Sequence, residues 1–298
     1  MSFAHAIGPE HDRRHVPGPD ALPLWSESWW FPFHDPASEV SVVFRAGVYA
    51  QQRRANLFLF VAHRGALVHT FVEHAAPLPP VEDGGLSVCG LRVEWEVPLE
   101  RFRLRYDGGG TRFDVRWTAT SPAYAYPHPP DVSYDVLPGH IEQGGRAAGT
   151  VTVGGVDHPI DCLAHRDHSW GGERDWAKFR RWTYLSGELP SGTWFNAVRI
   201  DLDGAVIHVG GLWDGLRLHT PAAIAIDDRT TDGGTRQSGV ACDLTDEDGR
   251  LYRFTADAPA VICPVQMGRT WLKDGVVRWR RGDEVGWGIH EHGYLEHD

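Results

Sequence analysis

The sequence predicts an all-β protein that consists of two packed β-modules. Short segments rich in β-branched and aromatic residues recur at regular spacing, and Gly-rich turns separate them, a pattern typical of sandwiches and barrels. No segment of ten or more residues has the periodicity of an amphipathic helix. Because residues 21–298 are too many for one small barrel, we expect an N-terminal module over 21–170 and a C-terminal module over 171–298.

The elements of the first module follow from local pattern. Residues 1–20 are charged and contain proline, so we expect a disordered or loosely tethered arm there. Residues 91–97 alternate apolar and polar side chains, which predicts a strand with one buried face. The turn Asp-Gly-Gly-Gly at 107–110 predicts a hairpin, because glycine adopts the positive φ that such turns need. The strand-like segments here are 40–50, 55–62, 86–97 and 111–120.

Three hairpins are predicted in the second module. They pair residues 194–201 with 205–213 around Asp203-Gly204, 238–245 with 250–256 around 247–249, and 276–281 with 285–294. Residues 175–180 are expected to form one or two helical turns. The Pro- and Tyr-rich stretch 121–138 predicts a long loop, either between the modules or over the mouth of a pocket.

Composition excludes several classes of protein. The formal charge is -11 and basic residues form only short runs, so nucleic acid is not an expected partner. No 18-residue apolar run exists, so no transmembrane helix is expected. The N-terminus lacks the apolar region of a signal peptide, and the four cysteines follow no metal or disulfide spacing. We therefore expect a cytoplasmic protein, and a homodimer is compatible with this composition.

Residues 165–176, His-Arg-Asp-His-Ser-Trp-Gly-Gly-Glu-Arg-Asp-Trp, contain the densest group of polar and aromatic side chains. A carboxylate next to an imidazole can act as a general acid or base near neutral pH. In a strand, Asp167 and His168 point to opposite faces, and Gly171-Gly172 predicts a bend or a strand exit. The structural alternative is a buried plug in which Asp167, Arg174 and Asp175 satisfy one another.

A second polar cluster is His140-x-Glu142-Gln143. Residues 140 and 142 share one face of a strand, so an imidazole and a carboxylate can converge on one cavity. The same sequence is equally compatible with a solvent-facing strand. The C-terminal histidines His290, His292 and His297 are expected to lie on the surface.

Other site chemistries have weaker support. A metal site would combine His165, Asp167 and His168 with His140 or Glu142, but this spacing matches no metal signature, and we predict no metal. Ser169 lacks the Gly-x-Ser-x-Gly elbow of a serine nucleophile. No Gly-rich phosphate loop follows a strand and opens a helix, so no nucleotide cofactor is expected.

The segment Asp167-His168-Ser169-Trp170-Gly171, which follows a Gly-rich hairpin near residues 140–155, resembles the Asp-His-x-Trp-Gly element of the carotenoid 1,2-hydratase/AttH-like superfamily. The longer string, from Arg166 to Gly171 with Arg174-Asp175-Trp176, is similar to a bacterial branch of it. The resemblance covers most of residues 22–298. It implies two tandem lipocalin-like β-modules, an apolar ligand pocket and no cofactor, but it does not specify one reaction.

The function expected from these features is lyase, isomerase or cyclase chemistry without a cofactor, on the carbon–carbon double bond of an isoprenoid- or polyketide-like molecule. Asp167 or His168 would donate a proton, and Glu142 or His140 would accept one. The thirteen tryptophans of the chain either wall a ligand pocket or fill the barrel interiors. The expected substrate-binding residues are Trp170, Trp176, Tyr184 and Trp213.

Two other classes of function stay open from the sequence. One is a protein that binds a hydrophobic lipid or terpenoid without changing it. The other is metal-dependent hydrolysis or oxygenation at the histidine- and carboxylate-rich segment 165–176.

Overall fold

The computed structural model describes residues 7–127, 139–202 and 205–296. The chain divides into two compact units, Met1–Arg174 (unit 1) and Asp175–Asp298 (unit 2). Within the described residues, regular structure is β apart from three short 3-10 helices, which confirms the all-β fold class. None of the described helices is long and apolar enough to cross a membrane. The division falls after Arg174, close to the boundary predicted after residue 170.

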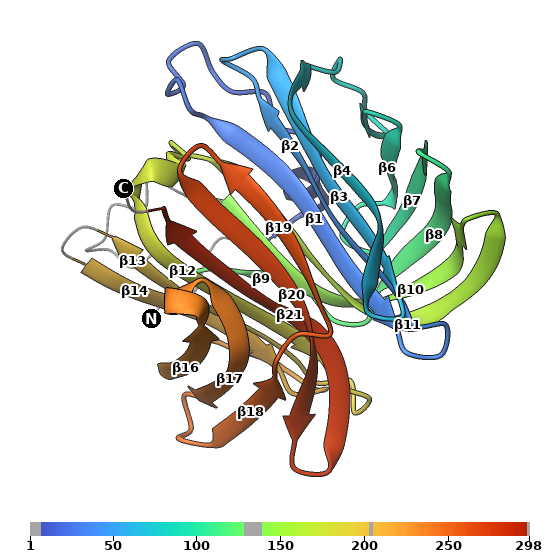
Figure 1. Cartoon of the computed structure of the whole chain (residues 1–298). Helices are drawn as coiled ribbons and strands as arrows, with labels where there is room; N and C mark the ends of the chain where they lie inside the picture. Colours follow the sequence, from blue (N-terminus) through green and yellow to red (C-terminus); the bar gives the residue numbers. More distant parts are fainter. Residues whose placement is uncertain (1–6, 128–138, 203–204, 297–298) are drawn as a thin grey trace. The chain divides into compact units, whose positions relative to one another are not determined.

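Unit 1 contains one 3-10 helix and one mixed-length antiparallel sheet (Figure 1). Its elements are η1 (Pro9–Asp12), β1 (Ser26–Asp35), β2 (Val40–Tyr49), β3 (Arg54–His63), β4 (Ala66–Pro77), β5 (Gly85–Val88), β6 (Leu91–Val97), β7 (Arg101–Gly108), β8 (Thr111–Ala119), β9 (Tyr124–Ala125), β10 (Gly139–Val153) and β11 (Val156–Gly171).

The sheet of unit 1 brings its first and last strands together. The strand order is β4-β3-β2-β1-β11-β10-β8-β7-β6-β5, and β9 pairs with β10. The strand β11 therefore lies between β1 and β10, as Figure 1 shows in blue and yellow-green. Its antiparallel partners are Trp30 and Glu142 for Asp167, and Trp29 and Ile141 for His168. This register decides which side chains of β1 and β10 share a face with Asp167 and which share a face with His168.

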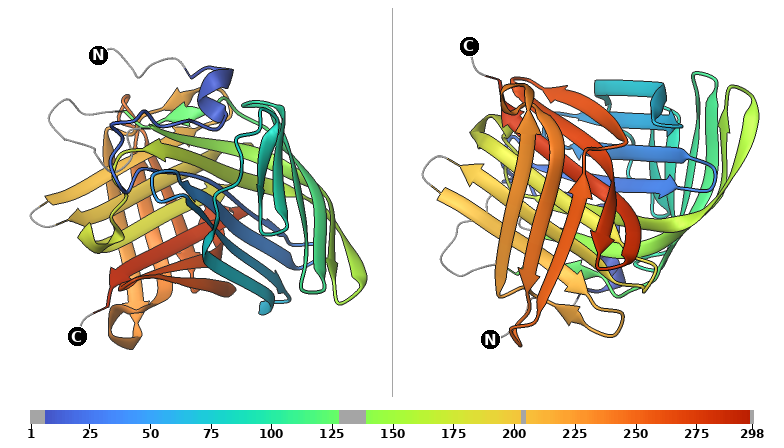
Figure 2. Two further views of the ribbon diagram at one scale, coloured as in Figure 1. Left: turned by 90° about the horizontal axis from the view of Figure 1, so that it is seen from above. Right: turned by 60° about the horizontal axis from the view of Figure 1, so that its bottom comes forward.

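In unit 2, as in unit 1, the first long strand pairs with the last strand. Its elements are η2 (Trp176–Lys178), β12 (Phe179–Glu188), β13 (Trp194–Leu202), β14 (Ala205–Trp213), β15 (Leu218–His219), β16 (Ala223–Thr231), η3 (Asp232–Gly234), β17 (Arg236–Thr245), β18 (Leu251–Asp257), β19 (Val261–Met267), β20 (Thr270–Arg281) and β21 (Glu284–Leu295). The order is β15-β14-β13-β12-β21-β20-β18-β17-β16, with β19 on β20, so β12 pairs with the last strand β21. Figure 2 shows β20 and β21 as the red hairpin.

Each unit has its own apolar core on one face of its sheet. In unit 1 the core is aromatic: the Phe31 ring lies 5.4 Å from Phe44 and from Phe102. In unit 2 the rings of Phe195 and Phe254 stack at 3.9 Å, and Trp279 meets Phe195 edge to face. In β8 of unit 1, buried and exposed side chains alternate, so one face of the strand packs on the core of that unit.

The hairpins predicted around residues 107–110, 203–204 and 247–249 and between 276–281 and 285–294 are present. The Gly-rich hairpin expected near residues 140–155 is instead the long strand β10 followed by β11, and β1 and β4 were not predicted. The structure shows 3-10 helix at 176–178, within the segment expected to make helical turns. The strands β1, β4, β10 and β11 extend the sheet of unit 1 well beyond the predicted segments. Their mixed polar sequences hid them, because β1 and most of the second half of β11 are buried on both faces.

The N-terminal segment differs from the loosely tethered arm expected for residues 1–20. From residue 7 onward it belongs to unit 1, in which the fully buried Asp12 side chain pairs with Arg166 of β11. Three predicted features fall outside the described residues, wholly or in part: residues 1–6 of the arm, 128–138 of the long loop, and the turn Asp203-Gly204.

Candidate functional site

The strand β11 presents two different polar groups on its two faces. Asp167 shares a face with His165 and with its register partner Glu142. His168 lies on the other face, with Arg166 and Trp170. The prediction that Asp167 and His168 point in opposite directions is confirmed. The strand ends at Gly171, where Gly171 and Gly172 both adopt positive φ, so the predicted strand exit is confirmed as well.

On the first face, the Glu142 carboxylate lies at the centre of a buried hydrogen-bond network. Its Oε1 lies 2.6 Å from His140 Nε2 and accepts a hydrogen bond from the Tyr126 hydroxyl at 3.0 Å. Its Oε2 lies 2.7 Å from His165 Nε2. Burial alone would raise the pKa of Glu142, but the two imidazoles lower that pKa to about 2. Glu142 is thus an ionised carboxylate that holds His140 and His165.

Asp167 lies beside this network but is not tied into it. Its Oδ1 is buried and has no hydrogen-bond partner in the part of the chain that the structure describes. Burial, with Glu142 adding to the effect, raises the pKa of Asp167 to about 6, although His140 acts in the opposite direction. One ligating atom each from His140, Glu142 and Asp167 lie within 4.8 Å of one another. The two carboxylates therefore have different protonation tendencies within one cluster.

His140 is oriented by both of its neighbours. Its ring stacks on Tyr126 with centroids 4.2 Å apart and planes 4° apart, and its Nε2 bonds Glu142. Its Nδ1 is buried and has no hydrogen-bond partner among the described residues. The convergence predicted for residues 140 and 142 is confirmed, and the solvent-facing alternative is wrong because both side chains are buried.

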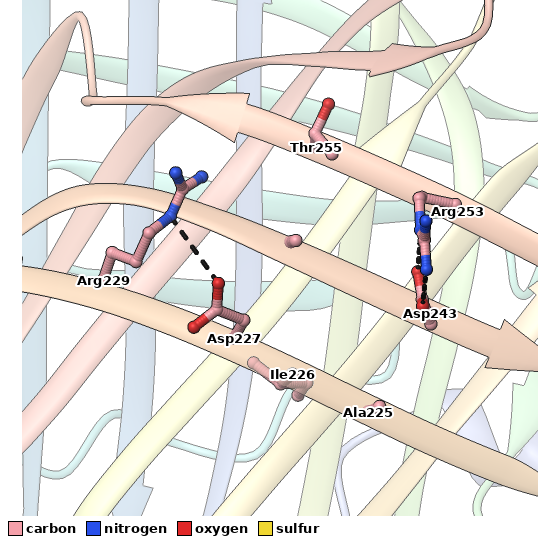
Figure 3. Close-up of a pocket in the computed structure, with 8 residues that line it drawn as sticks. Ala225, Ile226, Asp227, Arg229, Asp243, Arg253 and Thr255 are labelled. Carbon is pink, nitrogen blue, oxygen red and sulfur yellow. Dashed lines mark hydrogen bonds and ion pairs between the residues drawn. The ribbon is translucent and has the colours of Figure 1, made fainter.

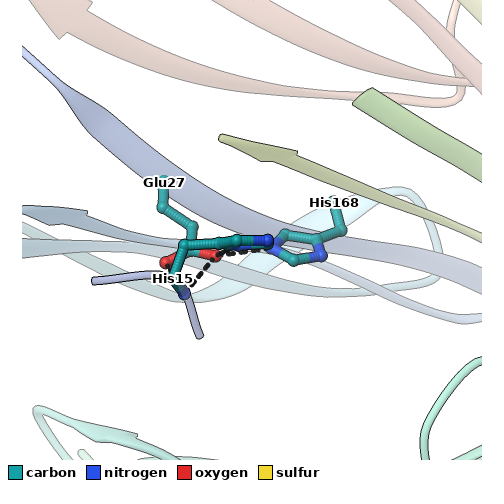
Figure 4. A group of neighbouring side chains, drawn as sticks. All are labelled: His15, Glu27 and His168. Carbon is teal, nitrogen blue, oxygen red and sulfur yellow. Dashed lines mark hydrogen bonds and ion pairs between the residues drawn. The ribbon is translucent and has the colours of Figure 1, made fainter. Parts of the chain in front are cut away.

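On the opposite face, His168 and His15 converge on one carboxylate oxygen (Figure 4). Glu27 Oε1 lies 2.7 Å from His15 Nδ1 and 2.9 Å from His168 Nε2. Burial opposes a charge on His168, but the carboxylates of Asp12 and Glu27 raise its pKa. His168 is therefore enclosed by protein groups.

Arg166 forms a buried ion pair on the same face. Its guanidinium donates to both Asp12 oxygens, at 2.7 and 3.1 Å, and twice to Gln143 Oε1. Both charged side chains are completely buried. A buried guanidinium held by four hydrogen bonds to two side chains is a structural element.

The predicted plug of Asp167, Arg174 and Asp175 is not what the structure shows. Arg174 donates instead to the hydroxyls of Ser28 and Ser169, at 3.0 and 2.8 Å. Asp175 caps η2 by accepting a hydrogen bond from the Ala177 amide. Arg174 and Asp175 therefore bond groups other than Asp167. Asp167 has no salt bridge among the described residues.

The metal set considered from the sequence is divided between the two faces, because His168 points away from His165 and Asp167. Two smaller groups can hold a metal by the types and positions of their atoms. They are His140 with Glu142 and Asp167, and His15 with Glu27 and His168.

The four aromatic residues expected to bind substrate occupy separate places. Trp170 lies on the His168 face of β11, where it stacks on His15 at 4.4 Å. Trp176, Tyr184 and Trp213 belong to unit 2, in which Trp176 contacts the rings of Phe179 and Trp182. Trp170 is therefore not on the strand face that carries Asp167, and the role of the other three in binding stays a prediction.

The C-terminal histidines are a clear correction. The prediction placed His290 and His292 on the surface, but both are buried. They bond the two oxygens of Asp228, each at 2.9 Å, and Asp228 also accepts from Arg181. The partner lies on β16, more than sixty residues away, so the local sequence gave no sign of this burial. His297 lies outside the described residues.

A shallow cavity of about 500 Å³ lies on the outer side of β16, β17 and β18 (Figure 3). Its charged side chains are already paired: Arg229 lies 3.9 Å from Asp227, and Arg253 bonds Asp243. These side chains are mostly exposed, and the cavity contains neither an imidazole nor a buried carboxylate. It offers no counterpart to the acid and base groups around Glu142.

Sequence reasoning missed several residues of the two clusters. Tyr126 lies in the segment expected to be a loop, and Asp12 and His15 lie in the segment expected to be a tethered arm. Glu27 is the second residue of β1, a strand that was not predicted. The proximity of these residues depends on strand register and on long-range packing, for which a single sequence carries no signal.

Comparisons with known proteins identify a family and a fold. The family model described as "Domain of unknown function (DUF7064)" matches residues 8–295. No protein of curated function matches the sequence. An AttH-like protein from Nitrosomonas europaea has 15% identity and a TM-score of 0.67, over 93% of this chain and 98% of that one.

Two further solved structures share the fold. Kievitone hydratase from Nectria haematococca has 13% identity and a TM-score of 0.66, over 91% of this chain and 89% of that one. CghA has 13% identity and a TM-score of 0.64, over 92% and 89%. These matches confirm the tandem lipocalin-like fold that the resemblance implied.

Proposed function

We propose that this chain, which belongs to the family described as a domain of unknown function (DUF7064), catalyses acid–base chemistry on a carbon–carbon double bond without a cofactor. The observation that supports this most is the contrast between two neighbouring carboxylates. Both oxygens of Glu142 accept hydrogen bonds, whereas Asp167 Oδ1 is buried without a partner among the described residues. A carboxyl group of the second kind can carry a proton and give it to a bound molecule.

In the hydratase direction, Asp167 protonates one carbon of the double bond and the other carbon becomes cationic. Water then adds to the cation and loses a proton to His140 Nδ1. Glu142 supports this step because its bond to His140 Nε2 holds the proton there and leaves Nδ1 as the acceptor. Transfer of that proton back to Asp167 completes the cycle, and the net reaction is addition of water to an alkene.

The substrate in this proposal is an apolar isoprenoid- or polyketide-like molecule. Polar solvent would compete for the proton and for the cation, so the reaction requires an apolar, water-poor environment. Trp170, which lies on the opposite face of β11, is not part of this proposal, and binding of the ligand by Trp176, Tyr184 and Trp213 of unit 2 stays a prediction. In a cyclase version, such walls would act chiefly by holding the substrate in a reactive shape. The setting we propose is the cytoplasm.

Native mass spectrometry of the protein purified from its own host tests this function. We expect a co-purified apolar ligand that the wild-type protein converts during incubation and that accumulates on Asp167→Asn. The matched control is Asp161→Asn, on the same strand, whose carboxylate is 65% exposed and pairs with Arg146. Conversion by Asp167→Asn at the wild-type rate would disprove the acid assignment. A ligand that the wild type leaves unchanged would favour a hydrophobic-ligand-binding protein instead.

A further inference from the structure

Three ligating atoms from three distant parts of unit 1 converge on the face of β11 opposite Asp167. They are His15 Nδ1 from the N-terminal segment, Glu27 Oε1 from β1 and His168 Nε2 from β11, and they lie within 4.8 Å of one another. Figure 4 shows both imidazoles directed at the Glu27 carboxylate. We infer that these three residues form a binding site for a divalent transition-metal ion, separate from the proposed acid–base centre.

The donor atoms suit such an ion. Two imidazole nitrogens and one carboxylate oxygen are a donor set that zinc and non-haem iron accept, with remaining positions open to water. Zinc bonds of about 2.1 Å at a tetrahedral angle place two ligand atoms about 3.4 Å apart. The observed separations from Glu27 Oε1 are 2.7 Å to His15 and 2.9 Å to His168. Each of these two separations would need to lengthen by about 0.5–0.7 Å to admit an ion, and the third side of the triangle is at most 4.8 Å.

The surroundings hold the ligands in place before any ion binds. The His168 ring stacks on Trp29 at 4.7 Å, and the His15 ring stacks on Trp170 at 4.4 Å. Behind His168, an oxygen of Asp12 lies 3.5 Å from Nδ1, and that nitrogen has no hydrogen-bond partner among the described residues. A carboxylate behind a ligating imidazole is the usual support in metal sites, and a small movement of His168 or Asp12 would complete that hydrogen bond.

The site also has an entry path and a physical consequence. Glu27 and His168 are completely buried, whereas the His15 side chain is 26% exposed and marks the open side. Since His15 belongs to the segment that precedes β1, a bound ion would link that segment to the sheet. Metal binding should therefore stabilise unit 1 and protect residues 7–20 from proteolysis, whatever reaction the Asp167 face catalyses.

Cobalt and zinc titrations of the untagged full-length protein, after removal of metals with a chelator, test the inference. We expect one equivalent of cobalt to bind with the visible absorption of a low-coordinate site, and zinc to displace it. His15→Ala should weaken binding at least about tenfold. The matched control His11→Ala lies in the same segment, outside the triangle, and should bind as the wild type does.

Limited proteolysis with and without zinc provides a second readout that needs no enzymatic activity. Zinc should slow cleavage within residues 7–20 of the wild type and of His11→Ala, but not of His15→Ala. Because His15 is partly exposed, its alanine variant should fold, which a melting curve without metal checks. Absence of stoichiometric cobalt binding to the wild type, or unchanged binding by His15→Ala, would overturn the inference.

Discussion

Asp12→Ala should destabilise unit 1 more than any exposed substitution in the N-terminal segment. The change removes a carboxylate that accepts two hydrogen bonds from Arg166, at 2.7 and 3.1 Å, and one from the Leu99 amide. Both members of the ion pair are completely buried, so Gln143 would be the one remaining side-chain acceptor for Arg166 among the described residues. Breaking such a pair from one side costs about 3–5 kcal/mol, a large part of the roughly 5–15 kcal/mol that keeps a domain folded.

Hydrogen exchange measured by mass spectrometry in increasing urea separates the two units, because peptides from β10 and β11 report on unit 1 alone. The control Glu10→Ala removes a carboxylate that is 72% exposed, and it should change the unfolding free energy by no more than about 0.5 kcal/mol. Adding Arg166→Met to Asp12→Ala should recover part of the loss, because it removes the unpaired buried charge. A cost for Asp12→Ala below about 1 kcal/mol would refute the structural role assigned to this pair.

Three further predictions concern stability. Tyr126→Phe deletes the hydroxyl that donates to the buried Glu142 carboxylate, so urea unfolding should show a loss of about 1.5–3 kcal/mol. Burial opposes the charge of Asp228, but His290 and His292 hold its pKa far below 3.8. The ionised carboxylate therefore stabilises the folded state above about pH 4, and this stabilisation is lost as the pH falls below that value. Asp228→Asn should remove this acid dependence from melting curves. Gly286→Ala would place a Cβ 1.8 Å from the Glu188 carbonyl oxygen and should lower the melting temperature by several degrees, whereas Gly84→Ala, with open space around it, should not.

A strand could be predicted where burial of one face makes apolar and polar residues alternate along the sequence. The segment β6 alternates cleanly, because only one of its faces meets the core. The strand β1 does not alternate, because both of its faces are buried, and its Ser, Glu and Trp side chains look irregular in sequence. Topology was not accessible from the sequence either, since the pairing of β1 with β11 joins residues about 140 positions apart.

For the candidate site, strand periodicity predicted the relations within one strand and failed between strands. The shared face of His140 and Glu142 and the opposite directions of Asp167 and His168 follow from a period of two. The partners Asp12, Glu27 and Tyr126 come from other segments, so no spacing could reveal them. The same limit explains the wrong placement of His290 and His292, whose burial depends on the distant Asp228.

The proton transfer assigned to Asp167 can be measured directly once a ligand has been identified. The protein is incubated with that ligand in heavy water, and deuterium bound to carbon in the product is counted by mass spectrometry. Our account predicts one deuterium on a former double-bond carbon with the wild type and with Asp161→Asn, and none with Asp167→Asn. Equal incorporation by Asp167→Asn, or a product of the wild type without deuterium on carbon, would contradict it.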